Sequence, residues 1–132
     1  MTRGILLVDH GSRRAEANAV VERIAGQLAR RVPDTIVRVA HMEIAEPTVA
    51  QGLASCIAAG ADDIVVHPYF LGPGHHSTHD IPRLLREAGG DHPDVRMRIS
   101  APLGAHPKLV DVILERIDAA PPSDITDGQP AR

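Results

Sequence analysis

Short apolar runs alternate along this chain with longer segments in which apolar residues recur every three to four positions. Residues 5–8 and 64–66 are continuous aliphatic runs, which are typical of strands buried on both faces. Residues 15–31 instead have the periodicity of an amphipathic helix. The apolar positions of this predicted helix are Ala17, Val20, Val21, Ile24 and Leu28. A strand followed by a helix is therefore the unit that the pattern predicts.

The same alternation continues to residue 118. Strands are expected at 5–8, 36–40, 64–66 and 95–99, and helices at 15–31, from Pro47 to about Gly60, from the capping residue Asp80 to Gly90, and from Pro107 to Ile117. The resulting order βαβαβαβα predicts an α/β fold, a flavodoxin-like parallel sheet of four strands with helices on both faces. A chain of 132 residues suits one domain, expected at 1–118. The polar, proline-rich residues 119–132 are expected to form a disordered tail.

Charge and cysteine content exclude several classes of protein. The net charge is −3, without the basic stripe of a nucleic-acid-binding protein, so no nucleic-acid partner is expected. Cys56 is the only cysteine, which excludes an intrachain disulfide and a cysteine-based zinc site, and we expect it to be a buried apolar residue. The run at 5–8 is too short for a signal segment or a membrane span, so we expect a cytoplasmic protein without a membrane partner.

Chemically active side chains follow the carboxyl ends of the first three predicted strands. They are His10 after the first, His41 and Glu43 after the second, and His75, His76 and His79 after the third. Carboxyl ends of parallel strands meet at one edge of a sheet, where ligands bind. Imidazoles with a carboxylate suit iron, cobalt, nickel or zinc. The spacing of His41 and Glu43 predicts that they share a face in extended chain, and only one of the adjacent His75 and His76 is expected to face the cleft.

Other polar and aromatic residues have structural interpretations. His67 is expected to be a packed histidine with a hydrogen-bond partner, and Tyr69 and Phe70 are expected in the core. His92 and His106 precede prolines and are expected in turns. Residues 9–12 resemble the Arg-His-Gly motif of histidine phosphatases, but Asp9 replaces the arginine and would repel phosphate.

Four motifs in register resemble the short sirohydrochlorin chelatases, which are class II tetrapyrrole chelatases. They are Val8-Asp-His-Gly-Ser-Arg-Arg14, Ala40-His-Met-Glu-Ile-Ala-Glu-Pro47, Phe70-Leu-Gly-Pro-Gly-His-His76 with Asp80-Ile-Pro82, and Ala101-Pro-Leu-Gly104 with His106. The resemblance covers residues 4–118 and is strongest to the iron-inserting, plant-type members. It implies a lyase-class enzyme that inserts Fe²⁺, or next Co²⁺, into sirohydrochlorin for sirohaem or cobalamin biosynthesis, with nickel as a further candidate.

The resemblance also implies the roles of particular residues. His10, His76 and Glu43 would be the catalytic and metal-holding residues, with His75 as an alternative to His76. The expected substrate-binding residues are Ser12, Arg13, Arg14, Gly74 and His75. No permanent cofactor is expected, because the divalent metal is a substrate. The short members resemble half of a two-lobed chelatase, which implies a homodimer. The alternative functions are a non-catalytic tetrapyrrole- or metal-binding module and a histidine phosphatase-like hydrolase.

Overall fold

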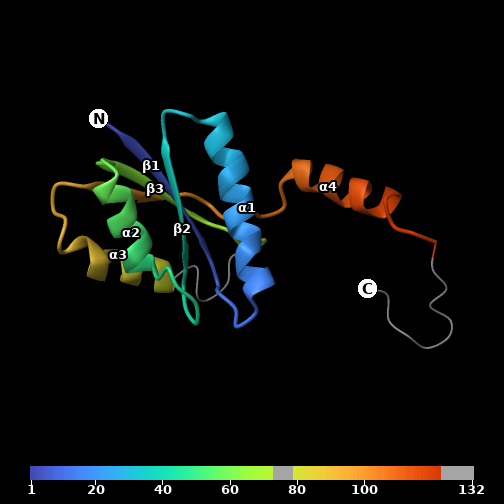
Figure 1. Ribbon diagram of the computed structural model, residues 1–132, viewed down its shortest axis with the longest axis horizontal. Coiled ribbons are helices and arrows are strands. Elements are labelled where there is room, and N and C mark those ends of the chain that lie inside the picture. Colours follow the sequence, from blue (N-terminus) through green and yellow to red (C-terminus); the bar gives the residue numbers. More distant parts are fainter. Residues whose placement is uncertain (73–78, 123–132) are drawn as a thin grey trace.

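A parallel sheet of four strands forms the centre of the protein (Figure 1). The structure is a computed structural model and describes residues 1–72 and 79–122. The strands are β1 (Arg3–Asp9), β2 (Ile36–His41), β3 (Asp63–Pro68) and β4 (Arg96–Ile99). Their order across the sheet is β2-β1-β3-β4, and every neighbouring pair is parallel. The predicted α/β fold is confirmed.

Helices cover both faces of this sheet, as predicted. α1 (Ala15–Arg31) lies on one face, and α2 (Val49–Ala58) and α3 (Ile81–Gly89) lie on the other (Figure 1). α4 (Pro107–Asp118) covers neither face; it extends away from the sheet, and none of its residues is buried. No helix within residues 1–72 and 79–122 is long and apolar enough to cross a membrane.

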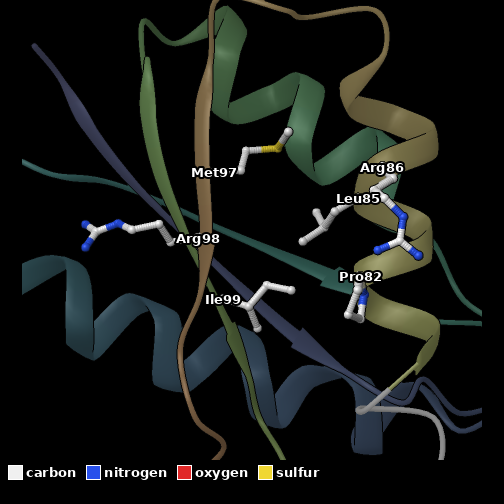
Figure 2. A pocket seen from close by; sticks show the side chains of 6 residues that line it. All are labelled: Pro82, Leu85, Arg86, Met97, Arg98 and Ile99. Atoms are coloured by element: carbon white, nitrogen blue, oxygen red, sulfur yellow. The ribbon is translucent and has the colours of Figure 1, made fainter.

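β4 is an edge strand, which confirms the prediction from its alternating sequence. It pairs with β3 along one side only. Met97 and Ile99 point from β4 toward α3, where Pro82 and Leu85 lie, whereas Arg98 points to the opposite side of the strand (Figure 2). Basic residues along an exposed edge hinder pairing with further strands.

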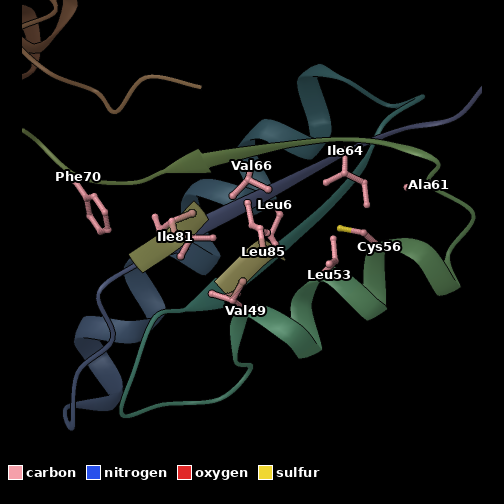
Figure 3. Packing of buried hydrophobic residues seen from close by; sticks show 12 residues of the cluster. Leu6, Val49, Leu53, Cys56, Ala61, Ile64, Val66, Phe70, Ile81 and Leu85 are labelled. Carbon is pink, nitrogen blue, oxygen red and sulfur yellow. The ribbon is translucent and has the colours of Figure 1, made fainter. Parts of the chain in front are cut away.

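The larger hydrophobic core lies between the sheet and the α2–α3 layer. It combines apolar residues of β1, β2, β3, α2 and α3 with Ala61 and Phe70 from the connections (Figure 3). Gly52 of α2 permits this close packing: a Cβ at that position would lie 2.8 Å from Leu6 Cδ1 and 2.9 Å from Ala40 Cβ. A residue larger than glycine would push the helix off the sheet, because protein cores are close-packed.

The smaller core lies under α1 and is centred on Leu7, Val21 and Ala25. The sequence predicted that Val20, Ile24 and Leu28 lie on one helical face, with Ala17 and Val21 beside them. That prediction was partly wrong, because Val20 is 39% exposed. The sheet beneath the helix decides which part of a broad apolar stripe is buried.

Two helix starts differ from the sequence prediction. Pro47 was expected in the first turn of α2, but Thr48 is the N-cap, and its side chain and that of Gln51 form a reciprocal capping box. Asp80 stands at the N-cap of α3 but makes no side-chain capping hydrogen bond. Its backbone is already helical there (φ −78°, ψ −40°), whereas a capping side chain needs extended backbone.

Candidate functional site

The candidate site lies at the carboxyl ends of β1 and β3, where the direction of the chain across the sheet reverses. From β1 the chain passes through α1 to β2 on one side, and α2 then returns it to β3 on the other side. Crevices outside such switch points are where open α/β sheets bind ligands. His10 follows β1 directly, so the fold places the first predicted catalytic histidine at this crevice.

The ring of His10 stacks on Phe70, the second residue after β3. The two ring centroids are 4.1 Å apart, with 27° between the ring planes. Phe70 is itself buried, and the Tyr69 N–H donates to the Val8 carbonyl at 2.7 Å, which holds this segment beside β1. Phe70 was predicted as a core residue; it is one, and it also orients the exposed His10 imidazole.

Glu43 lies beside the His10 backbone because the loops after β1 and β2 are bonded together. The Met42 N–H donates to the Asp9 carbonyl at 2.9 Å, and the Glu43 N–H donates to the His10 carbonyl at 3.1 Å. Gly11 makes this approach possible: its φ is +90°, and a Cβ there would lie only 1.9 Å from the Glu43 carbonyl oxygen. The described backbone therefore supports the prediction that His10 and Glu43 lie at the same edge of the sheet.

Asp9 and His41 form a pair that the sequence analysis missed. His41 is 1% exposed, and its Nδ1 lies 2.5 Å from Asp9 Oδ1. The two residues are direct neighbours in the β1–β2 register. The expectation that His41 and Glu43 share a face in extended chain was wrong, because β2 ends at His41, whose imidazole is held inside by Asp9, while Glu43 is exposed. Only the strand register could have identified the pair.

The predicted substrate-binding residues Ser12, Arg13 and Arg14 precede α1. The Ser12 backbone exchanges two hydrogen bonds with the Asn18 side chain, at 2.9 and 2.8 Å. Arg13 and Arg14 are both exposed, and Arg14 pairs with Glu16 at 2.8 Å. A backbone hydrogen bond, followed by the Arg14 contact, holds the pKa of the Glu16 carboxyl below its ordinary value. Two guanidinium groups at a helix N-terminus form a place suited to carboxylate ligands.

The remaining predicted site residues, Gly74, His75 and His76, lie outside the described residues. Their roles stay predictions. Within the part of the chain that is described, no three histidine, cysteine, aspartate or glutamate side chains gather into a metal-binding cluster.

Two histidines outside the site have structural contacts. His67 Nδ1 lies 2.8 Å from Ser100 Oγ, which confirms the predicted packed histidine, and burial lowers the pKa of His67. His106 Nδ1 accepts a hydrogen bond from the Lys108 N–H at 3.1 Å and so caps α4. These contacts explain both imidazoles without a ligand.

Known proteins resemble this chain in sequence. A sirohydrochlorin ferrochelatase of the Arabidopsis thaliana chloroplast is 42% identical over 114 residues, which are 86% of this chain and 51% of that protein. A sirohydrochlorin cobaltochelatase of Methanococcoides burtonii is 35% identical over 121 residues, covering 86% of this chain and 92% of the relative. The chain thus spans about half of the plant relative and nearly all of the archaeal one.

A solved structure shares the fold. The sirohydrochlorin chelatase SirB of Bacillus subtilis subspecies spizizenii, in complex with cobalt, superposes with a TM-score of 0.82 at 29% identity. The superposition covers 89% of this chain and 50% of SirB. The model of the CbiX family matches residues 4–120, which include all of β1 but its first residue, as well as Gly11 and Glu43. This chain is a member of the CbiX family.

Proposed function

We propose that this chain is a sirohydrochlorin chelatase, which inserts a divalent metal ion into the tetrapyrrole, with Fe²⁺ as the first candidate and Co²⁺ as the second. The observation that carries the proposal is the placement of His10 at the switch point. Its ring is oriented by Phe70, and its carbonyl is bonded to the Glu43 N–H, in a chain of the CbiX family. The names of the plant and archaeal relatives support the substrate and both metals.

The chemistry requires removal of the pyrrole N–H protons and transfer of a partly dehydrated metal ion to the ring nitrogens. An imidazole suits both tasks near neutral pH, as a base and as a ligand for a borderline metal. We assign His10 to proton abstraction or metal holding, His76 to the complementary role, and Glu43 to proton removal or metal guidance. His75 remains the alternative to His76.

The carboxylate side chains of sirohydrochlorin would bind the basic rim of the crevice. Arg13 and Arg14 are exposed beside the N-terminus of α1, where helix N–H groups also favour anions. Ser12 belongs to the same turn, and Gly74 is proposed as a further substrate-binding residue. This local positive charge is compatible with the net charge of −3, because nearby groups determine the field at the site.

The proposed active unit is a homodimer located in the cytoplasm. The chain covers half of SirB and half of the plant relative, so two copies would supply the two lobes of those longer proteins.

Anaerobic insertion kinetics test the function. Purified protein and sirohydrochlorin are mixed with Fe²⁺, Co²⁺ or Ni²⁺, and the absorbance change is followed beside a reaction without protein. We expect acceleration that His10→Ala abolishes and His92→Ala retains, because His92 lies in the turn between α3 and β4, at the amino edge of the sheet. Equal loss in both variants, or no acceleration with any metal, would move the assignment to a binding module.

A further inference from the structure

Two large apolar side chains lie uncovered at the candidate site. Apart from the N-terminal methionine, Leu71 and Ile44 are the most exposed large apolar residues in the part of the chain that the structure describes, at 70% and 63%. Leu71 directly follows Phe70, on which the His10 ring stacks. Ile44 directly follows Glu43, whose N–H is bonded to the His10 carbonyl. Apolar surface that gathers at a ligand site, unlike single residues elsewhere on a surface, indicates contact with the ligand.

The order of the strands places these two residues on opposite sides of His10. β2 and β3 are the two neighbours of β1 in the sheet. Ile44 lies in the loop after β2, and Leu71 lies in the segment after β3. His10, which follows β1, is therefore flanked on each side by one exposed apolar residue along the carboxyl edge of the sheet.

Ile44 has a backbone conformation that isoleucine rarely adopts. Its φ is +74°, and the Ala45 N–H donates to the Glu43 carbonyl at 2.8 Å, so Ile44 is the central residue of a three-residue turn. A turn of this kind with a positive φ is the strained form of the γ-turn, and a β-branched residue is poorly suited to it. Glycine or asparagine would fit this backbone better. The turn therefore holds an exposed apolar side chain although the conformation destabilises the fold.

Packing within the chain does not explain the strain at Ile44. The residue belongs to neither hydrophobic core. The turn is fixed instead by Glu43, whose N–H donates to the His10 carbonyl at 3.1 Å and whose carbonyl oxygen lies against Gly11. Strained residues cluster at ligand-binding and catalytic sites, where rigid placement of a side chain serves the function. A side chain that is placed before the ligand arrives also loses less conformational entropy on binding.

The second apolar residue, Leu71, follows a residue that is anchored in the core. Phe70 is buried, and Figure 3 shows it at the end of the core cluster, beyond the carboxyl end of β3. The Phe70 N–H donates to the Pro68 carbonyl at 2.9 Å, and the Phe70 carbonyl accepts from the Leu103 N–H at 3.0 Å. The position of Leu71 beside His10 is therefore set by both packing and hydrogen bonds.

A tetrapyrrole has two chemically different parts, an apolar macrocycle and the carboxylates at its periphery. The exposed Arg13 and Arg14 suit the carboxylates, whereas the macrocycle needs apolar contacts. We propose that Ile44 and Leu71 contact the macrocycle of sirohydrochlorin from the two sides of His10 and so hold its ring nitrogens at the imidazole. This inference rests on the proposed function and assigns two further substrate-contacting residues to it.

Substitution by asparagine tests both contacts. Asparagine tolerates a positive φ, so Ile44→Asn keeps the turn and removes the apolar surface, and Leu71→Asn does the same on the other side. Binding of metal-free sirohydrochlorin is measured by the change in its absorbance. We expect each variant to raise the Kd roughly 5- to 20-fold, because each contact buries part of one aliphatic side chain. Ile44→Leu and Leu71→Met keep the apolar surface and should lose far less affinity.

A matched control and the salt dependence show whether the lost contact is apolar and local. Val20→Asn replaces an apolar residue of α1 that is 39% exposed, and it should bind sirohydrochlorin as wild type does. Ile44→Asn should weaken binding by the same factor at about 0.05 M and about 0.5 M salt, whereas Arg13→Gln should weaken it more at the lower concentration, because salt screens ionic contacts. The Tm of Ile44→Asn should be no lower than that of wild type, since the substitution relieves the strained turn.

Insertion kinetics separate failure of this inference from failure of the proposed function. A wild-type protein that inserts metal, with asparagine variants that bind sirohydrochlorin as tightly as wild type, would overturn the inference alone. So would equal weakening by Val20→Asn, or a lowered Tm of Ile44→Asn, because the side chain would then support the fold. A wild-type protein that neither binds sirohydrochlorin nor inserts metal would overturn both.

Discussion

Replacing Gly11 with alanine should separate the two loops that build the site. The added Cβ would lie 1.9 Å from the Glu43 carbonyl oxygen and 3.2 Å from His41 Cβ. Ordinary van der Waals contact begins near 3.4 Å, so the loops after β1 and β2 would have to move apart by roughly 1.5 Å. That movement stretches the hydrogen bonds that join Met42 to Asp9 and Glu43 to His10.

The expected loss of stability has two parts. Alanine at a φ of +90° costs about 1–3 kcal/mol, and two weakened hydrogen bonds cost about 1 kcal/mol each, so the free energy of unfolding should fall by about 3–5 kcal/mol. For a chain of this length that is a decrease in Tm of roughly 10–20 °C. Gly60→Ala is the matched control: its φ is +110°, but nothing lies within 4 Å of the added Cβ, so only the first part applies.

Both parts of the stability loss, the backbone cost and the cost of the weakened hydrogen bonds, are measured by urea and thermal unfolding followed by circular dichroism. The proteins compared are wild type, Gly11→Ala and Gly60→Ala. If Gly11→Ala costs no more than Gly60→Ala, the close approach of the two loops does not exist as described. The same variant should lose insertion activity even below its lowered Tm, because the displaced Glu43 no longer lies beside His10.

Three further outcomes are expected. Leu53→Ala removes a side chain that is 1% exposed and should lower the free energy of unfolding by about 2–5 kcal/mol. Leu71→Ala, at a position that is 70% exposed, should change it little. Equal urea midpoints for the two variants would contradict the assignment of Leu53 to the core. Cys56 should not react with a disulfide reagent at about pH 8 in the folded protein, because burial raises the pKa of its thiol to about 11. In concentrated guanidinium it should react completely, and the absorbance of the thiol released from the reagent measures both reactions. Burial lowers the pKa of His67 from 6.5, so the unfolded chain binds its proton more readily, and stability that is complete above pH 6.5 should decline as the pH falls through that value. His67→Gln should lessen this decline in urea midpoints measured across the window, and a steeper decline in the variant would reverse the sign of the argument.

The strands and helices of this protein were predictable because their signals are local. The aliphatic run at 5–8 lies within β1, and the helical period of 15–31 matches the bounds of α1. Alternation of the two periods was enough to predict a parallel sheet, and with it the edge at which His10 and Glu43 meet. The motifs carried the family assignment, which the comparisons confirmed over residues 4–120.

Contacts between distant segments depended on the tertiary structure. The order β2-β1-β3-β4 places Asp9 opposite His41, and this pairing turns a histidine expected at the open edge into a buried one. It also places Phe70 against His10. A strand period of two residues tells which side chains share a face, but not which strand will lie beside another.

The sequence alone determined the elements, the fold class and the family of this protein, since each depends on residues that are neighbours along the chain or on motifs in register. Only the tertiary structure decided which apolar surfaces find a partner. The period of α4 is as regular as that of α1, yet α1 packs on the sheet and α4 extends from it. Burial of a helix depends on where the preceding connection directs it, and the connection before α4 is hydrogen-bonded to Val66 of β3 and to Phe70 just after β3.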